Sequence, residues 1–137
     1  MSTDKPVSTL LGFDYGTVRI GVAVGQTLTG TANPLETVKT INSKPDWVRI
    51  AAIIDEWKPG ALVVGLPYNM DDTESEVAEK AKRFARQLNG RFHLPVHMID
   101  ERLTSVEAQR HLGADAETSG ELDAAAASLI LETWLNQ

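Results

Sequence analysis

The chain has 137 residues, of which 42% are hydrophobic, and a formal net charge of −6 at pH 7. This length predicts one domain with a single core and excludes a two-lobed enzyme. The absence of cysteine excludes disulfides, thiolate zinc sites and thiol nucleophiles, so any chemistry depends on carboxylates, hydroxyls, histidines and bound ions. The net negative charge argues against a protein that coats DNA non-specifically. It does not exclude a nuclease whose acidic residues are masked by divalent cations.

The N-terminal segment is polar, and we expect residues 1–8 to form a disordered tail ahead of one domain over residues 9–137. No apolar stretch has secretory or membrane-spanning length, because the longest run, Ala124–Leu131, is interrupted by Ser128. The sequence therefore predicts a cytoplasmic protein with no membrane partner.

Three β-strands are predicted in the first third of the chain. An apolar run from Thr9 to Asp14 and a second run over residues 19–25 flank a glycine-bearing turn, which is typical of a β-hairpin. A third run, residues 31–40, contains Pro34 and alternates near its end, so we expect it to extend the hairpin as an outer strand.

The pattern then changes to a helical period. Ser43, with Asp46 three residues on, resembles a capping box, and Pro45 fits the first turn of a helix. That helix is predicted to end near Trp57, with apolar residues at helical spacing: Trp47, Ile50, Ala51 and Ile54. The continuous apolar run Ala61–Leu66 is typical of a central parallel strand that is buried on both faces.

The second half of the sequence is predicted to form three more helical segments and one strand. Their expected limits are a helix at about 74–89, a strand at 95–99, a helical stretch at about 105–112 and a last helix at about 121–135. The resulting order predicts an α/β fold with a mixed five-stranded sheet flanked by helices. Three of these strands form an antiparallel meander, and the other two are parallel.

Acidic residues at strand ends are the first candidates for function. Asp14 ends a central strand, where a carboxylate is costly unless it is paired or bound to a cation, although it could also cap the turn backbone. Asp100 and Glu101 follow another strand and should point to opposite faces, so only one of them can join Asp14. The alternative is an exposed acid with Arg102 as its counterion.

Asp123 is the third candidate, in the first turn of the last helix. The helix dipole alone favours an acid there, but Ala124–Ala127 are small enough to let this helix lie close to the sheet. If the three carboxylates converge, their repulsion favours a hard divalent cation such as Mg²⁺. A pair of such ions can assist an in-line phosphoryl displacement.

The histidines and basic residues give weaker signals. His93 and His97 have the spacing of helical metal ligands, but Pro95 between them breaks the helix that this spacing requires. A group of basic side chains forms either a solvated face or a phosphate contact: Lys80, Lys82, Arg83, Arg86 and Arg91.

Four segments together resemble a known family. They are residues 12–17 (GFDYGT) with 20–24 (IGVAV), residues 64–67 (VGLP) with 69–71 (NMD), residues 100–105 (DERLTS) and residues 122–126 (LDAAA). With these segments in this order, the chain resembles the YqgF (RuvX) family over about residues 9–135. Members of this family are pre-16S ribosomal RNA nucleases, also described as Holliday-junction-resolvase-like, with a ribonuclease H-like fold.

The resemblance implies hydrolysis of nucleic-acid phosphodiester bonds with Mg²⁺ or Mn²⁺ held by Asp14, Glu101 and Asp123. It implies a role in maturation of the 5′ end of pre-16S rRNA, and it favours Glu101 over Asp100 as the inward acid. The substrate-binding residues expected with this interpretation are Asn69, Arg102, Lys82 and Arg86.

Several alternatives stay open at this point. The chain could resolve Holliday junctions in branched DNA, or it could be a non-catalytic module that binds the ribosome or the transcription machinery. Asp-x-Gly-Thr in a hairpin also occurs in actin-like ATPases and sugar kinases, but those need a far longer chain. We expect pre-rRNA or branched DNA as partner, ribosomal association as a further property, and either a monomer or a homodimer.

Overall fold

One mixed sheet runs through the computed structural model, which describes residues 9–42, 44–67, 76–103 and 119–137. The strands are β1 (Thr9–Asp14), β2 (Arg19–Gln26), β3 (Thr31–Ile41), β4 (Lys44–Pro45), β5 (Ala61–Leu66) and β6 (Val96–Asp100). The helices are α1 (Trp47–Trp57), α2 (Glu76–Phe92), a 3₁₀ turn η1 (Glu101–Leu103) and α4 (Ser119–Leu135). The order of strands in the sheet is β4-β3-β2-β1-β5-β6.

Strand β1 lies at the centre of this sheet. It pairs antiparallel with β2, which pairs antiparallel with β3, and it pairs parallel with β5, which in turn pairs parallel with β6. The meander and the two parallel strands predicted from the sequence are therefore confirmed. The predicted tail at residues 1–8 and the predicted helical stretch at 105–112 lie outside the described residues.

The strand count and the start of α1 differ from the prediction. The sheet has six strands rather than five, because Lys44 and Pro45 form a short strand that pairs with the end of β3. Pro45 therefore does not lie in the first turn of a helix. Asp46 caps α1 instead, because its carboxylate accepts a hydrogen bond from the Arg49 backbone N–H at 3.1 Å, as preferred N-cap residues do.

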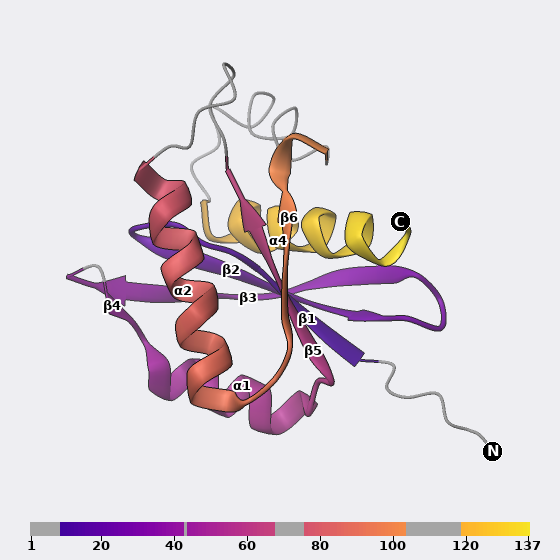
Figure 1. Cartoon of the computed structure of the whole chain (residues 1–137), viewed down its shortest axis with the longest axis horizontal. Helices are drawn as coiled ribbons and strands as arrows, with labels where there is room; N and C mark the ends of the chain where they lie inside the picture. The colour runs from indigo at the N-terminus through magenta and orange to yellow at the C-terminus, as the bar shows by residue number, and fades with distance from the viewer. Residues whose placement is uncertain (1–8, 43, 68–75, 104–118) are drawn as a thin grey trace.

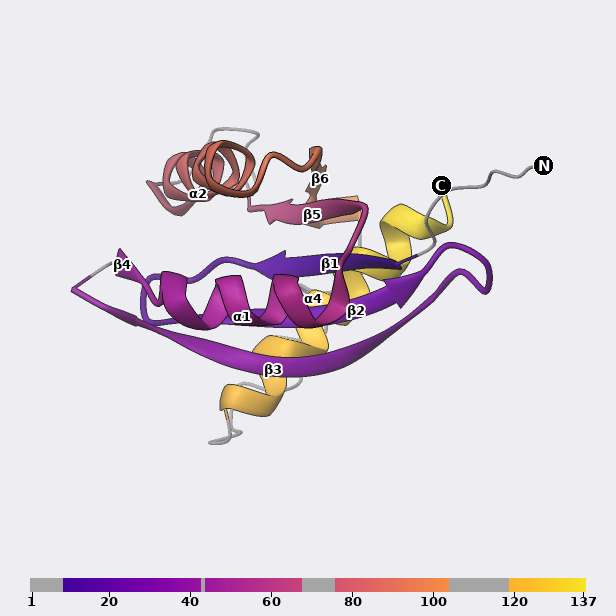
Figure 2. The same cartoon turned by 90° about the horizontal axis from the view of Figure 1, so that it is seen from below.

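The described helices lie on both faces of the sheet. Figures 1 and 2 show α1 and α2 on one face and α4 on the other. Two buried clusters correspond to these faces, a larger one that includes Phe13, Ile50 and Phe84, and a smaller one that includes Leu10 and Ile130. Within the described part of the chain, no helix is long and apolar enough to span a bilayer.

Small residues allow α4 to lie directly on β1 and β2. A methyl group added to Gly12 would come within 2.7 Å of the Leu131 Cβ, and one added to Gly21 would collide with the carbonyl oxygen of Asp123. On the helix side, Ala124 and Ala127 are buried against the sheet. The expectation that small residues bring α4 close to the sheet is confirmed.

The space around each glycine predicts opposite effects on stability for two substitutions. Gly21→Ala should lower the free energy of unfolding by at least about 2 kcal/mol, because the new methyl group meets backbone that has to shift. Gly90→Ala, in helix α2 with no atom within 4 Å of the new methyl group, should raise it by about 0.5–1 kcal/mol. Urea denaturation measures both values, and an unchanged midpoint for Gly21→Ala would contradict the described contact.

Candidate active site

Two acidic side chains are buried on the α4 face of the sheet. Asp14, the last residue of β1, is 4% exposed, and Glu101, the first residue after β6, is 3% exposed. Alternation along β1 places Asp14 on the same face as Leu10, which packs in the α4-side cluster. Glu101 lies on this face as well, because a Cβ added to Gly65 would meet both the Glu101 side chain and Ile130, which belongs to that cluster.

Gly65 on β5 brings these two acids together. The parallel register pairs Phe13 with Val64, and its continuation by one residue sets Asp14 beside Gly65. A methyl group added to Gly65 would come within 3.0 Å of the Glu101 Oε2 atom, so the Glu101 side chain reaches across this glycine. The two acids therefore flank Gly65 on β5, with Asp14 at the end of β1 and Glu101 directly after β6.

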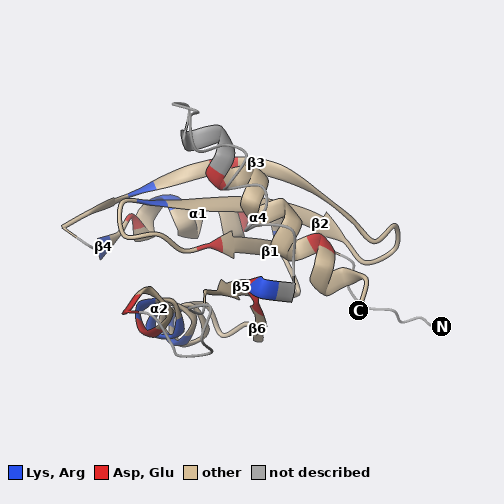
Figure 3. Ribbon diagram, turned by 90° about the horizontal axis from the view of Figure 1, so that it is seen from above, with Lys and Arg blue, Asp and Glu red and all other residues tan. Residues whose placement is uncertain are grey.

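Asp123 lies on the other side of Asp14. Its backbone rests on Gly21, and Gly21 is the residue that pairs with Asp14 across β1 and β2. Its carboxylate is bound to Arg19, with 2.7 Å between Arg19 Nε and Asp123 Oδ2. Figure 3 shows acidic segments at the end of β1 and at the start of α4.

The three acids meet only in part. In the stretches that the structure describes, no group of three or more Asp, Glu, His or Cys side chains is arranged to hold a metal ion. Asp14 and Glu101 lie on either side of Gly65, and the Asp123 carboxylate is bound to Arg19. Arg19 was not singled out from the sequence, although alternation along β2 places it on the same face as Gly21.

Asp100 points away from this pair. Its carboxylate accepts hydrogen bonds from the Arg102 side chain, with 2.7 Å between Arg102 Nη2 and Asp100 Oδ2, and from the Arg102 backbone N–H at 2.9 Å. These contacts hold the pKa of Asp100 below its usual range, the side-chain hydrogen bond being the largest cause. The predicted opposition of Asp100 and Glu101 is confirmed, and Glu101 is the buried one.

The remaining predicted site residues lie in different places. Lys82 and Arg86 line a cavity of about 590 Å³ beside Met98. The guanidinium of Arg102 is engaged by Asp100, and Asn69 lies outside the described residues. Their roles toward a substrate stay predictions.

His93 and His97 lie in different environments. His97 stacks on Trp134, with 4.7 Å between the ring centroids, while His93 is exposed after the end of α2. Their spacing in the sequence therefore does not correspond to a pair of ligands on one helix.

The Asp100 contact predicts a pH effect. Arg102→Gln should raise the pKa of Asp100 toward its ordinary value, because the guanidinium hydrogen bonds and positive charge that favour the ionised form are removed, while the backbone N–H of residue 102 can still donate. In the parent chain, Asp100 adds stability above its unfolded pKa of about 3.9, and this contribution is lost as the pH falls through the lower folded pKa. An NMR titration of the Asp100 carboxyl group measures the shift, and equal values in both chains would contradict it.

Comparison with known proteins identifies the family of this sequence. A family model described as "RuvX: Holliday junction resolvase" matches residues 8–137. A relative from Pseudomonas aeruginosa (strain LESB58), named "Putative pre-16S rRNA nuclease", is 53% identical over 98% of this chain and 96% of its own length. A relative of the same name from Azotobacter vinelandii is 55% identical over 92% of each chain.

Solved structures agree on the fold. The Thermus thermophilus RuvC protein in complex with a Holliday junction substrate has a TM-score of 0.58 at 19% identity and covers 94% of each chain. The fowlpox virus Holliday junction resolvase has a TM-score of 0.52 at 14% identity and covers 93% of this chain and 98% of its own. These likenesses confirm the predicted ribonuclease H-like fold, and the match of the family model over almost the whole sequence shows that the chain belongs to the RuvX family.

Proposed function

We propose that this chain is a metal-dependent nuclease whose active site is built around Asp14 and Glu101. Membership of the RuvX family gives the class of activity, the hydrolysis of nucleic-acid phosphodiester bonds. The observation that supports the location is the two carboxylates, each less than 5% exposed, at the ends of β1 and β6 on either side of β5. Two buried acids this close repel one another when both are ionised, so the site favours a cation.

The donor set fits Mg²⁺ or Mn²⁺. Both are hard ions that take carboxylate oxygens, and Mg²⁺ is commonly held by one or two carboxylates together with substrate phosphates. Asp14 and Glu101 would provide these carboxylates. Such a cation, when bound, stabilises the charge that develops on the phosphodiester oxygens.

We propose Asp123 as the third acid of the site. Its backbone rests on Gly21, next to Asp14 in the sheet, and its ion pair with Arg19 is accessible to solvent, with the two side chains 39% and 25% exposed. A pair this exposed contributes only about 0–1 kcal/mol to stability. Asp123 can therefore exchange Arg19 for a cation at small cost, and Arg19 holds it in place until then.

Precursor 16S rRNA is the substrate that we propose, with cleavage in the maturation of its 5′ end and ribosomal association as a consequence. The names of relatives that are more than 50% identical support this assignment. Branched DNA is the second candidate, because the description of the matching family is Holliday junction resolvase and the RuvC neighbour is bound to such a junction. For RNA contacts we propose Asn69, Arg102, Lys82 and Arg86.

Neutral substitutions at the two buried acids test the site. Asp14→Asn and Glu101→Gln should each reduce Mg²⁺-dependent cleavage by more than about 100-fold, because the charge that holds the cation is removed. In thermal unfolding, added Mg²⁺ should raise the midpoint of the parent chain and leave that of each variant unchanged. Asp100→Asn is the matched control, since Asp100 points away from the pair, and it should keep both cleavage and the Mg²⁺ effect.

Cleavage by Asp14→Asn at the parent rate would refute the proposed site. Absence of any Mg²⁺- or Mn²⁺-dependent cleavage by the parent chain would instead favour the non-catalytic binding module.

The two candidate substrates are separated by a direct comparison. Precursor 16S rRNA and a four-way DNA junction are each incubated with the parent chain in Mg²⁺, Mn²⁺ or chelator. We expect cleavage of the RNA near the mature 5′ end and none with chelator. Cleavage of the junction alone, at symmetric positions, would assign the chain to branched DNA instead.

A further inference from the structure

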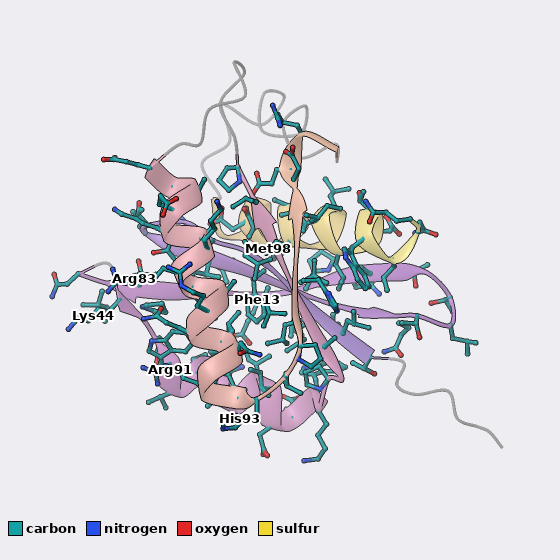
Figure 4. The ribbon with its side chains drawn as sticks, in the orientation of Figure 1. Phe13, Lys44, Arg83, Arg91, His93 and Met98 are labelled. Atoms are coloured by element: carbon teal, nitrogen blue, oxygen red, sulfur yellow. The ribbon has the colours of Figure 1, made fainter. Side chains whose placement is uncertain are left out.

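A second polar site lies on the opposite face of the sheet from Asp14. It is a cavity of about 450 Å³ between β4, the start of α1 and the outer side of α2. The residues that matter here are four cations, Lys44, Lys80, Arg83 and Arg91, and two aromatic rings, Tyr15 and Trp47. Figure 4 shows Lys44, Arg83 and Arg91 gathered on one side of α2, with Met98 on its other side.

The cations on α2 form one stripe. The stripe consists of three cations and one neutral residue, Lys80, Arg83, Gln87 and Arg91. They are spaced by three, four and four residues, so they lie along one side of the helix. At a rise of about 1.5 Å per residue, the stripe extends over about 16 Å, which is longer than a single phosphate group. Lys80, Arg83 and Arg91 are exposed, so their charged groups are accessible from solvent.

Trp47 holds Arg91 in a defined orientation. The guanidinium carbon lies 4.2 Å from the centroid of the Trp47 ring, and Phe84 stacks on Trp47 at 5.6 Å between centroids. A guanidinium stacked in this way keeps the N–H donors in its plane available, and these are the donors that bind a phosphate bidentately. The guanidinium of Arg91 is therefore already oriented to bind an oxyanion.

Among the described residues, no carboxylate lies within ion-pair distance of Lys44, Lys80, Arg83 or Arg91, whereas Arg19, for example, is paired. Their concentration at one cavity stands out in a chain whose net charge is −6. Like charges held together repel, and a bound anion removes this repulsion.

The chain connects this cavity directly to the acidic pair. Tyr15, which lines the cavity, follows Asp14, and the two side chains point to opposite faces of the sheet. Both sites therefore meet where β1 ends.

We propose that this cavity binds consecutive phosphates of the nucleic-acid strand whose cleavage we assign to Asp14 and Glu101. This inference rests on the proposed nuclease function and adds a binding surface on the far side of the sheet. A strand that passes over the end of β1 reaches both sites, so the cavity sets which phosphodiester lies at the acids. The contacts are to phosphate, so binding here is independent of base sequence.

The test measures binding in chelator, where cleavage does not occur. A fluorescein-labelled single-stranded RNA of 20 nucleotides is titrated with the parent chain and with a Lys80→Gln/Arg83→Gln variant. We expect the variant to bind at least tenfold more weakly at low salt for any base sequence. The slope of log K against log salt should decrease by about 0.7 for each lost phosphate contact.

Lys58→Gln is the control that removes a positive charge outside the cavity. Lys58 is a solvated cation at the end of α1, outside the cavity, and its contact to Asp55 is an exposed pair that adds little stability. Its removal should leave the affinity and the salt slope unchanged. Arg91→Lys keeps the charge but loses the planar donors, and we expect weaker binding from it as well.

Parent-like binding by Lys80→Gln/Arg83→Gln would overturn the proposal, as would an equal loss in Lys58→Gln. A polyglutamate peptide that binds the cavity more tightly than the RNA would overturn it in favour of an acidic protein partner. The Mg²⁺ effect on thermal unfolding should be unchanged in the cavity variants, which separates the two sites. RNA binding that depends on the cavity, in a parent chain that shows no cleavage, would refute the proposed nuclease function and the positioning role of the cavity, and would leave only its binding of phosphates.

Discussion

The contact between helix α4 and strands β1 and β2 is the constraint on which the candidate site depends. It requires that Gly12 and Gly21 have no side chain, since a Cβ at either position would meet the helix. Because α4 lies this close, it covers the end of β1 and sets the backbone of Asp123 over the residue that pairs with Asp14. Packing of small residues, rather than any polar contact, thus determines where the acids lie relative to one another.

The alternation of side chains along the strands divides the polar chemistry of the chain between two faces. Asp14 and Glu101 lie toward α4, while Tyr15 and the cations of α2 lie on the other side. The two adjacent residues Asp14 and Tyr15 therefore face sites of opposite charge. Because the sheet separates these sites, the acids and the cations do not neutralise one another. This separation explains how a chain with a net charge of −6 can present a positive surface to a polyanion.

Local patterns predicted most of the fold. Apolar runs identified β1, β2 and β5. Helical spacing identified α1 and its buried Ile50, but Ala51 of the predicted apolar side is exposed, and Ile53, which that spacing omitted, is buried. The predicted helix start at Pro45 was wrong because Pro45 pairs with Thr40 in the sheet, a strand pairing that a helix-capping pattern does not contain. For the site, alternation showed that Asp100 and Glu101 oppose one another, but only the resemblance selected Glu101. The Arg19 contact to Asp123 joins residues 104 positions apart, and no local signal predicts such a pair.

Strand β4 has a consequence for how copies of this chain can associate. It is only two residues long and pairs with the last two residues of β3, so within the described ranges most of the outer side of β3 has no neighbouring strand. Pro34 interrupts that side, because it has no N–H to donate, and short edge strands and edge prolines are common protections against pairing between sheets. Edge-to-edge extension of the sheet into a second molecule, and the aggregation that follows from it, is therefore disfavoured along β3.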